Sequence, residues 1–487
     1  MNNLIKNELT KIFHKKAIYI VLIITLAFTI LNCVLEKLFS NGENFIYRDV
    51  DSIKESMNSL DRNDPEQLNI YYSLSAQVQT IELAQKYKKD SWQRYIIYNR
   101  AQSIIENMIK NANTEEYEYF KKIYDEFVKA LENDDWTIFA KEELEKTNNE
   151  INSITSQSEE EKKYQEDKLQ LLNDQKQALQ WRIEKNIPYG NTARSIALDE
   201  YANMKEELRG LEQQQKIKKL THEQKIQKQQ LESNLKLYEH AIHNNIDSKI
   251  EITEINNQPA LATTADARLA VTHYTYSMFI TIIVIIIAGT AISEESNKGT
   301  IKLLLVRPYK RTKILAAKFI SCLIVLLFTY IVTALFQTII GGFTYGFSNY
   351  LGKIVIYNFT TGKIETLSTI RYLILTGLAV LPEILLLLTL SFTLSTILNN
   401  SPVAIAIPLL GTMVSDIINQ LFLHYKKAQF LKYFVTPNWD LRMYLFGKLP
   451  QYENLTLTFS LLICLIYFTV MILLSHKIFQ TRDIKNV

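Results

Sequence analysis

The chain has 487 residues, of which 47% are hydrophobic, and its formal net charge at pH 7 is +3. These averages conceal two unlike parts, because residues 36–273 hold 32 Lys and Arg against 42 Asp and Glu, whereas the remainder holds 22 against 9. Such asymmetry indicates parts that lie in different surroundings and argues against a uniform soluble domain.

The three cysteines lie within apolar stretches of the sequence. Cys33, Cys322 and Cys464 are each surrounded by residues typical of membrane-spanning helices. The acidic part therefore contains no disulfide, and we expect helix packing to stabilise it.

The chain begins with a basic amphipathic segment, residues 1–16. Apolar side chains at helical spacing share one face, and four lysines surround that face. A helix of this kind lies in the interface of an anionic leaflet, and the lack of a small-residue cleavage site distinguishes it from a signal peptide. Residues 17–35 follow as the first span, about one bilayer long. Lysines before this span and acidic sequence after it predict a cytoplasmic N-terminus.

Residues 36–273 are predicted to form an extracytoplasmic helical domain. They contain three glycines and three prolines, and this scarcity of helix breakers favours long helices. Heptad-like spacing of apolar residues over 136–185 and 199–246 predicts two helices that fold back on each other as an antiparallel hairpin. A helical stalk and a domain that captures a ligand or partner both fit this pattern. His240 and His243 could bind a metal, but polar helix faces collect such pairs by chance, and we expect no metal site.

Five further spans are expected after this domain. Cytoplasmic segments hold 14 Lys and Arg and the two short external loops hold 8, a bias that predicts cytoplasmic chain ends. The predicted fold class is an all-α integral membrane protein with six transmembrane helices and a large, coiled-coil-like extracytoplasmic domain between the first two. The remaining predicted segments are the spans 274–292, 319–340, 373–398, 402–423 and 455–475, the external loops 341–372 and 424–454, and the cytoplasmic tail 476–487.

A short basic segment, residues 293–318, connects the second and third spans. Together with Ile292 it holds seven Lys and Arg against two acids, Glu294 and Glu295. Such a segment cannot lie in lipid, so it faces water on the cytoplasmic side. Because it runs directly into a span at each end, we predict that it receives mechanical work from another protein.

The sequence lacks common catalytic motifs. It contains no G-x-x-x-x-G-K-[ST] phosphate-binding loop, so we expect no ATP site and no catalytic residue in this chain. Two acids at membrane depth, Glu383 beside Pro382 and Asp416, are candidates for a translocation path, because a buried carboxylate is costly unless it is paired, protonated or hydrated. In the alternative interpretation, Glu383 caps a broken helix and Asp416 lies near the interface.

The basic segment also matches a known family pattern. In permeases of the type-2 ABC exporters (ABC-2), an acidic residue, a G-T-[IL] step and an R-P-x-x-R-x-x-[IL]-x-x-x-K run follow the second span, and this sequence resembles that pattern. The matching residues are Glu294, Glu295, Gly299, Thr300, Ile301, Arg307, Pro308, Arg311, Ile314 and Lys318.

The resemblance covers residues 1–35 and 272–487. It includes the sequence T-P-N-W-D-L at 436–441 in the last external loop and the residues Phe479, Arg482, Asp483 and Ile484 near the C-terminus. Residues 36–273 look like the helical insertion of Gram-positive members that resist peptide antibiotics.

The resemblance implies a membrane-spanning permease subunit of an ATP-driven exporter. It implies two copies of a separate ATPase subunit, which binds ATP and Mg, and a second permease, identical or related. The expected cargo is an amphipathic peptide, antibiotic or lipid that moves outward. Membrane lipid is a further expected partner, and nucleic acid is not. The residues it assigns to coupling with the ATPase are Glu294, Glu295, Gly299, Thr300, Leu303, Leu304, Arg307, Pro308, Arg311 and Lys313.

The alternative function is a non-transporting membrane sensor or scaffold whose coiled-coil outer domain binds a partner. In that case, residues 293–318 would be a basic linker that obeys the positive-inside rule. A scaffold would tolerate Glu at Arg307 and Arg311, whereas a coupled exporter would lose its ATPase.

Overall fold

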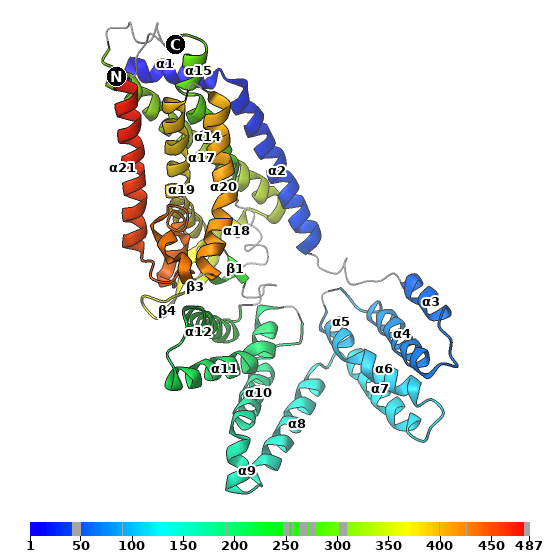
Figure 1. The fold of residues 1–487 in the computed structure, drawn as a ribbon. Helices are drawn as coiled ribbons and strands as arrows, with labels where there is room; N and C mark the ends of the chain where they lie inside the picture. The colour runs from blue at the N-terminus through cyan, green and yellow to red at the C-terminus, as the bar shows by residue number, and fades with distance from the viewer. Residues whose placement is uncertain are drawn as a thin grey trace.

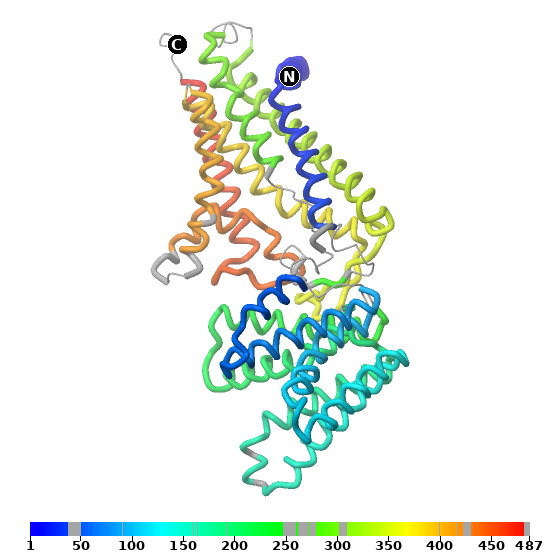
Figure 2. The backbone as a smooth tube through the Cα atoms, turned by 90° about the vertical axis from the view of Figure 1, so that its right-hand side faces the viewer, coloured from blue at the N-terminus to red at the C-terminus, as the bar shows by residue number. Residues whose placement is uncertain are grey.

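The computed structural model describes residues 1–40, 50–89, 91–190, 192–246, 253–255, 258–262, 271, 278–300, 309–398, 400–424 and 426–481. They form a bundle of long apolar helices and a helical domain at one end of that bundle (Figure 1). Helices α1 (Asn2–Phe13) and α15 (Ser293–Asn297) lie at the other end. A view at right angles shows the same arrangement (Figure 2).

Six helices among the described residues are long and apolar enough to cross a membrane, as predicted. The chain is therefore mostly helical, with the architecture of a multi-pass membrane protein. The third of these helices begins at Arg311, so the end of the predicted basic segment belongs to the same helix as the third span. The bundle helices are α2 (Lys16–Ser40), α14 (Met278–Thr290), α17 (Arg311–Tyr345), α19 (Thr369–Ile397), α20 (Ser401–His424) and α21 (Leu457–Thr481).

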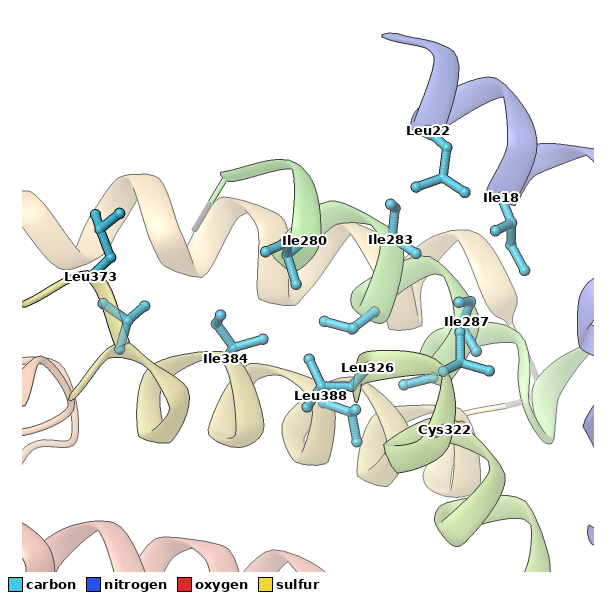
Figure 3. Close-up of a cluster of buried hydrophobic side chains, with 14 of the residues drawn as sticks. Ile18, Leu22, Ile280, Ile283, Ile287, Cys322, Leu326, Leu373, Ile384 and Leu388 are labelled. Carbon is cyan, nitrogen blue, oxygen red and sulfur yellow. The ribbon is translucent and has the colours of Figure 1, made fainter. Parts of the chain in front are cut away.

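Helix α14 packs against four other bundle helices, α2, α17, α19 and α20. Ile283 of α14, Cys322 of α17 and Leu388 of α19 belong to one buried cluster (Figure 3). Gly289 lets α20 approach closely, because a Cβ there would lie 2.7 Å from Ile405. Lipid tails are as apolar as these side chains, so close packing rather than hydrophobic burial favours helix association in a membrane.

Helix α19 is continuous through Pro382. The alternative interpretation, in which Glu383 caps a broken helix, is therefore wrong. Proline removes a helical hydrogen bond, but neighbouring helices and local adjustments satisfy the freed backbone groups in membrane helices.

The all-α prediction is correct only in part, because the described residues are mostly helical but also contain a four-stranded antiparallel sheet beside the helical domain (Figure 1). Its order is β1-β2-β3-β4, and β2 pairs with β3 in the register Leu261↔Val355. The β-branched run at Ile354, Val355 and Ile356 is typical of a buried strand. The strands are β1 (Thr253–Ile255), β2 (Gln258–Ala262), β3 (Lys353–Asn358) and β4 (Lys363–Ser368).

The two predicted external loops contain regular structure. Residues 341–372 include the end of α17, the strands β3 and β4, and the start of α19. The shorter elements in the two loops are the helix α18 (Ser348–Leu351) and the 3₁₀ helices η3 (Lys426–Tyr433) and η4 (Leu441–Gly447).

Residues 50–246 form the helical domain. One hydrophobic cluster around Ile97 and Phe127 joins helices from α4 to α8, and another around Tyr201 and Tyr238 joins α10, α11 and α12. The elements are α3 (Val50–Asn58), α4 (Pro65–Ala84), α5 (Trp92–Ile96), the π-helix η2 (Ile97–Ala101), α6 (Gln102–Lys110), α7 (Tyr117–Glu132), α8 (Thr137–Thr155), α9 (Glu159–Tyr164), α10 (Glu166–Glu184), α11 (Ala193–Ile217) and α12 (His222–His243).

The two long helices predicted in this domain are each a helical hairpin. Residues 136–185 fold into α8, α9 and α10, and residues 199–246 belong to α11 and α12. Ser158 and Thr221 cap the starts of α9 and α12. Each hydroxyl accepts from a backbone N–H three positions on, and the backbone N–H of each cap residue donates in return to the Glu161 or Gln224 side chain. These capping boxes satisfy helix N–H groups and so favour a helix start within an otherwise periodic sequence.

A buried arginine fixes the turn between α10 and α11. The Arg182 side chain is 1% exposed, and its Nη2 lies 2.5 Å from Asp199 Oδ1. Arg182 also donates to the Ser195 carbonyl at 3.2 Å and lies over the Tyr189 ring at 4.1 Å. Burial raises the pKa of Asp199 even though Arg182 opposes the shift. Removing one member of such an ion pair is destabilising, because the other charge is left without its partner.

The helical domain contacts the bundle through the sheet and a loop. Leu237 of α12 packs in one buried cluster with Leu261 of β2 and Val355 of β3. At the start of α12, His222 Nε2 lies 2.9 Å from the carbonyl oxygen of Pro450. The domain therefore rests on the sheet, whose strand β4 continues directly into α19, and on the loop that precedes α21.

Candidate functional site

Helix α1 lies across the end of the bundle opposite the helical domain and packs against α17 (Figure 1). Leu4 and Ile12 are each 8% exposed, as expected for the apolar face of the predicted amphipathic helix. Glu8 and Lys11 are three residues apart on one side of α1, and Lys15 lies just beyond its end. These three side chains reach the predicted coupling segment.

The central contact is the buried ammonium group of Lys318. This side chain of α17 is 3% exposed, and its Nζ lies 2.8 Å from Glu8 Oε2 and 3.0 Å from Glu295 Oε1. Lys11 Nζ contacts the same two carboxylates, at 3.0 Å from Glu8 Oε1 and 2.8 Å from Glu295 Oε1. A lone buried charge would cost several kcal/mol, and this alternation of charges offsets that cost. It also joins α1, α15 and α17.

The surroundings of Glu8 and Lys11 favour their charged forms. Burial by itself would raise the pKa of Glu8, but the ammonium groups of Lys318 and Lys11 outweigh it and hold that pKa below its ordinary value. Burial would likewise lower the pKa of Lys11, but Glu295 and Glu8 outweigh it and raise that pKa. Both groups are therefore ionised at neutral pH.

A second set of ion pairs extends from Glu294. Lys15 Nζ lies 2.5 Å from Glu294 Oε2 and donates to Thr290 Oγ1 at 2.8 Å. Lys298 Nζ lies 2.7 Å from Glu294 Oε1, within the same short stretch of chain. We call Glu8, Lys11, Lys15, Glu294, Glu295 and Lys318 the ion-pair network.

The predicted coupling residues differ in their surroundings. Glu294 and Glu295 belong to the ion-pair network, and Arg311 Nη1 donates to the Gln480 carbonyl of α21 at 2.9 Å. Gly299 has a positive φ of +66°, which ends α15, and Thr300 Oγ1 donates to the Glu295 carbonyl at 3.2 Å. Lys313 is exposed. The residues outside the described part of the chain are Leu303, Leu304, Arg307 and Pro308.

Sequence reasoning missed the contribution of α1 to this site. Glu8 is the single acid among the first sixteen residues, in a segment otherwise rich in lysine. That isolated acid on a basic helix was an available signal for a specific cationic partner. The partner, Lys318, lies 310 positions further along the chain, so spacing alone could not identify it.

Glu383, the predicted path residue, lies near the middle of α19 and is partly buried. Arg442 of η4 is close enough for their charges to interact, and it binds Asp440 through two bonds of 2.9 and 2.8 Å. Burial would lower the pKa of Arg442, but Asp440 and Glu383 outweigh it and raise that pKa. Asp416 belongs to α20, and its side chain lies outside the described part of the structure.

The segment before η4 inserts into the bundle instead of remaining in solvent. Asn438 is fully buried, donates to the carbonyls of Lys432 and Phe434 at 2.8 and 2.7 Å, and accepts from Ser460 Oγ at 2.8 Å. Trp439 is 8% exposed and packs in a cluster with residues of α14 and α19. The polar bonds of Asn438 thus fix a loop that the sequence placed outside the bundle.

A family described as Protein of unknown function (DUF2705) matches residues 252–485. This range begins just before β1 and includes all helices from α14 to α21, but it excludes α1, α2 and the helical domain. The matched range therefore includes Glu294, Glu295 and Lys318 of the ion-pair network, whose α1 partners lie outside it.

Two proteins of Bacillus subtilis (strain 168) are similar to part of the chain. The uncharacterized protein YhcI is 31% identical over 206 residues, which are 42% of this chain and 64% of that protein. The uncharacterized membrane protein YdbK is 26% identical over 201 residues, 41% of this chain and 76% of that protein. The chain thus spans 64% of the length of the first relative. No solved structure matches the chain.

Proposed function

We propose that this chain is the permease subunit of an ATP-driven exporter of the ABC-2 type. A separate ATPase, present in two copies, binds ATP and Mg and supplies the energy, and a second permease completes the translocation path. The chain itself catalyses no covalent reaction. The observation that carries this proposal is the ion-pair network, which ties both ends of the basic segment 293–318 to the first helix of the chain.

The physical argument concerns force. A segment that receives a push must not yield at its connections, and here Glu294 and Glu295 at one end and Lys318 at the other are held by α1. Lys318 lies in the second turn of α17, a helix of 35 residues that forms an unbroken rod about 50 Å long. A displacement of its first turn therefore reaches the far end of the bundle.

The orientation follows from charge. We place the protein in the cell membrane with both ends, α1 and the basic segment on the cytoplasmic side, in agreement with the bias of Lys and Arg. Because α12 and the sheet lie at the other end of the bundle, the helical domain is then extracellular (Figure 2).

The proposed cargo is an amphipathic peptide, an antibiotic or a lipid that leaves the cell, as in resistance or immunity. An apolar bundle and an acidic outer domain favour cargo of this kind. Glu383 and Asp416 are the candidate path residues. Arg442 is a cationic neighbour of Glu383, and a carboxylate at membrane depth needs such a partner.

The test is reversal of two positive charges in the basic segment. Arg311 is unsuitable because it bonds the end of α21, so we choose Arg307→Glu combined with Lys313→Glu. The full-length tagged chain is purified from its native membrane, and subunits with a Walker motif are quantified by mass spectrometry. We expect recovery of the ATPase to fall about tenfold or more, because like charges then face the docking groove.

The matched control is Lys477→Glu, which reverses an exposed charge near the end of α21, outside the basic segment. It should retain the ATPase. Equal recovery of the ATPase with the double variant and the native chain would refute the coupling assignment. Absence of any ATPase from the native complex would favour the sensor or scaffold.

A further inference from the structure

The first turn of α15 is capped by a side chain from a different helix. Its own N-cap residue, Ile292, has no side chain that can accept a hydrogen bond. Ser395 Oγ accepts from the backbone N–H groups of Ile292 and Ser293, each at 3.0 Å. The first N–H groups of a helix lack partners within it, so an external oxygen satisfies a real requirement.

The position of Ser395 makes this cap a link between helices. Ser395 is fully buried and lies two residues before the end of α19. Its Oγ also donates to Ser293 Oγ at 3.2 Å, and Ser293 Oγ lies 2.8 Å from Ser401 Oγ, at the start of α20. Three serines thus connect the start of the basic segment to the α19–α20 hairpin.

The joint between α14 and α15 needs such support. The helix is interrupted at Ala291 and Ile292, and the backbone of Ile292 has φ −120° and ψ −43°, outside the usual helical values. An unsupported interruption of this kind can bend. The two bonds from Ser395 hold the backbone on both sides of the point where α15 begins.

The tight packing next to this joint leaves little freedom for another arrangement. Ser391, one helical turn before Ser395, donates to the carbonyl of Ile285 at 2.8 Å and to that of Ala404 at 3.1 Å. A Cβ at Gly289 would lie 2.9 Å from Ser391 Oγ. Helices α14, α19 and α20 are therefore already in close contact where Ser395 acts.

We propose that Ser395 is a positioning residue that makes the α19–α20 hairpin follow any displacement of α15. The source of that displacement, a partner ATPase, rests on the proposed function, but the mechanical link does not. With the cap in place, a movement of α15 is carried into α19 and α20. Without it, the interruption at Ile292 absorbs the movement.

The link is tested on the full chain in detergent without any ATPase. Spin labels at Lys298→Cys and Val403→Cys report the distance between α15 and α20, since both positions are exposed and the three native cysteines are buried. In Ser395→Ala we expect the distance distribution to broaden relative to the native Ser395. We also expect amide exchange at Ile292 and Ser293 to accelerate about tenfold, because two buried donors lose their acceptor.

The matched control is Thr389→Val. Thr389 is also fully buried in α19, but its hydroxyl donates to the carbonyl of Leu385 in its own helix. The distance distribution between positions 298 and 403 and the amide exchange at Ile292 and Ser293 should therefore remain native in Thr389→Val. A second label pair at Lys6 and Lys298 checks the fold, since the ion-pair network holds α15 against α1. This pair should keep its native distance in Ser395→Ala.

Three results would overturn the proposal. The first is an unchanged distribution between positions 298 and 403 in Ser395→Ala, and the second is the same broadening in Thr389→Val. The third is equal broadening of both label pairs, because Ser395 would then stabilise this whole end of the bundle. Loss of the ATPase from the native complex would instead refute the proposed function and leave the link intact.

Discussion

Replacing Lys318 by Met isolates the energetic role of the ion-pair network. Met is similar in length to Lys and fits an apolar helix, so the change removes the charge with little loss of packing. Lys318 is 3% exposed, and the Glu8 and Glu295 side chains are 13% and 16% exposed, so all three groups are largely desolvated. Removal of one partner from a buried pair costs about 3–5 kcal/mol.

The expected cost lies at the lower end of that range. Lys11 remains within 3.0 Å of Glu8 and 2.8 Å of Glu295 and keeps part of the attraction. Its side chain is 48% exposed, so water screens it more than Lys318. We expect Lys318→Met to destabilise the chain by about 3 kcal/mol and to lower Tm by about 5 °C.

The assay is thermal unfolding of the full chain in one detergent, followed by intrinsic tryptophan fluorescence. Lys313→Met, an exposed lysine of the same helix, is the matched control and should change stability by less than about 0.5 kcal/mol. Adding Glu8→Gln to Lys318→Met should recover part of the loss, because one uncompensated carboxylate is then removed. A Tm for Lys318→Met within about 1 °C of the native value would refute this reasoning.

Three further predictions use other parts of the structure. Gly289→Ala should cost about 1–3 kcal/mol, measured by Tm, because its Cβ meets α20, whereas Gly210→Ala meets nothing within 4 Å and should be neutral or stabilising. The pKa of Glu8 in the folded chain is lower than its ordinary value of 4.5, so the stability that its carboxylate contributes is complete above about pH 4.5 and is lost as the pH falls through the lower, folded-state pKa. When Tm is measured against pH, it should therefore fall less steeply at acidic pH in Glu8→Gln than in the native chain. Arg182→Met should cost about 1–3 kcal/mol, because it removes the bonds of the buried guanidinium to the half-exposed Asp199 carboxylate and to the Ser195 carbonyl, and limited proteolysis of the full chain should then cut the helical domain first.

The spans could be predicted from the sequence because each needs only a long local run of apolar residues. Their ends were harder to place, as the start of α17 illustrates. Arg311 and Lys313 look like loop residues by charge, yet they occupy the first turn of α17, where Arg311 bonds the carbonyl of Gln480. The basic end of a membrane helix can extend beyond the apolar region, so its charged residues resemble a loop in the sequence although their backbone is helical.

Two local signals were present in the sequence but were not used. Ser158 and Thr221 each precede, by three residues, a Glu or Gln whose side chain bonds back to the cap, and this pattern divides the two predicted long helices. The heptad spacing concealed them because it continues across each turn. The division of residues 136–185 and 199–246 into helical hairpins could therefore have been predicted, whereas the single long helix predicted for each range was wrong.

The sheet and the ion-pair network depend on contacts between distant parts of the chain. Leu261 pairs with Val355 across α14, the basic segment and α17, and the short strand β2 has no pattern of its own that identifies its partner. Glu8 and Lys318 are likewise far apart in the sequence. The sequence indicated that Glu294 and Glu295 belong to a functional segment, but it did not identify the lysines that pair with them. The fold brings Lys11, Lys15 and Lys318 to these two acids.

The pairing of β2 with β3 gives the basic segment a mechanical connection to the helical domain. Strand β3 follows α17 after the short helix α18, and it pairs with β2, which precedes α14 in the chain. Leu237 of α12 packs on the residues of that junction, Leu261 and Val355. A shift of α17 that is carried into β3 must therefore either distort the β2–β3 register or move α12 with the strands. Backbone pairing resists a change of register, since a one-residue slip would turn every buried strand side chain to the other face. Under the proposed function, ATP-driven movement of α17 thus reaches α12 of the outer domain through β3.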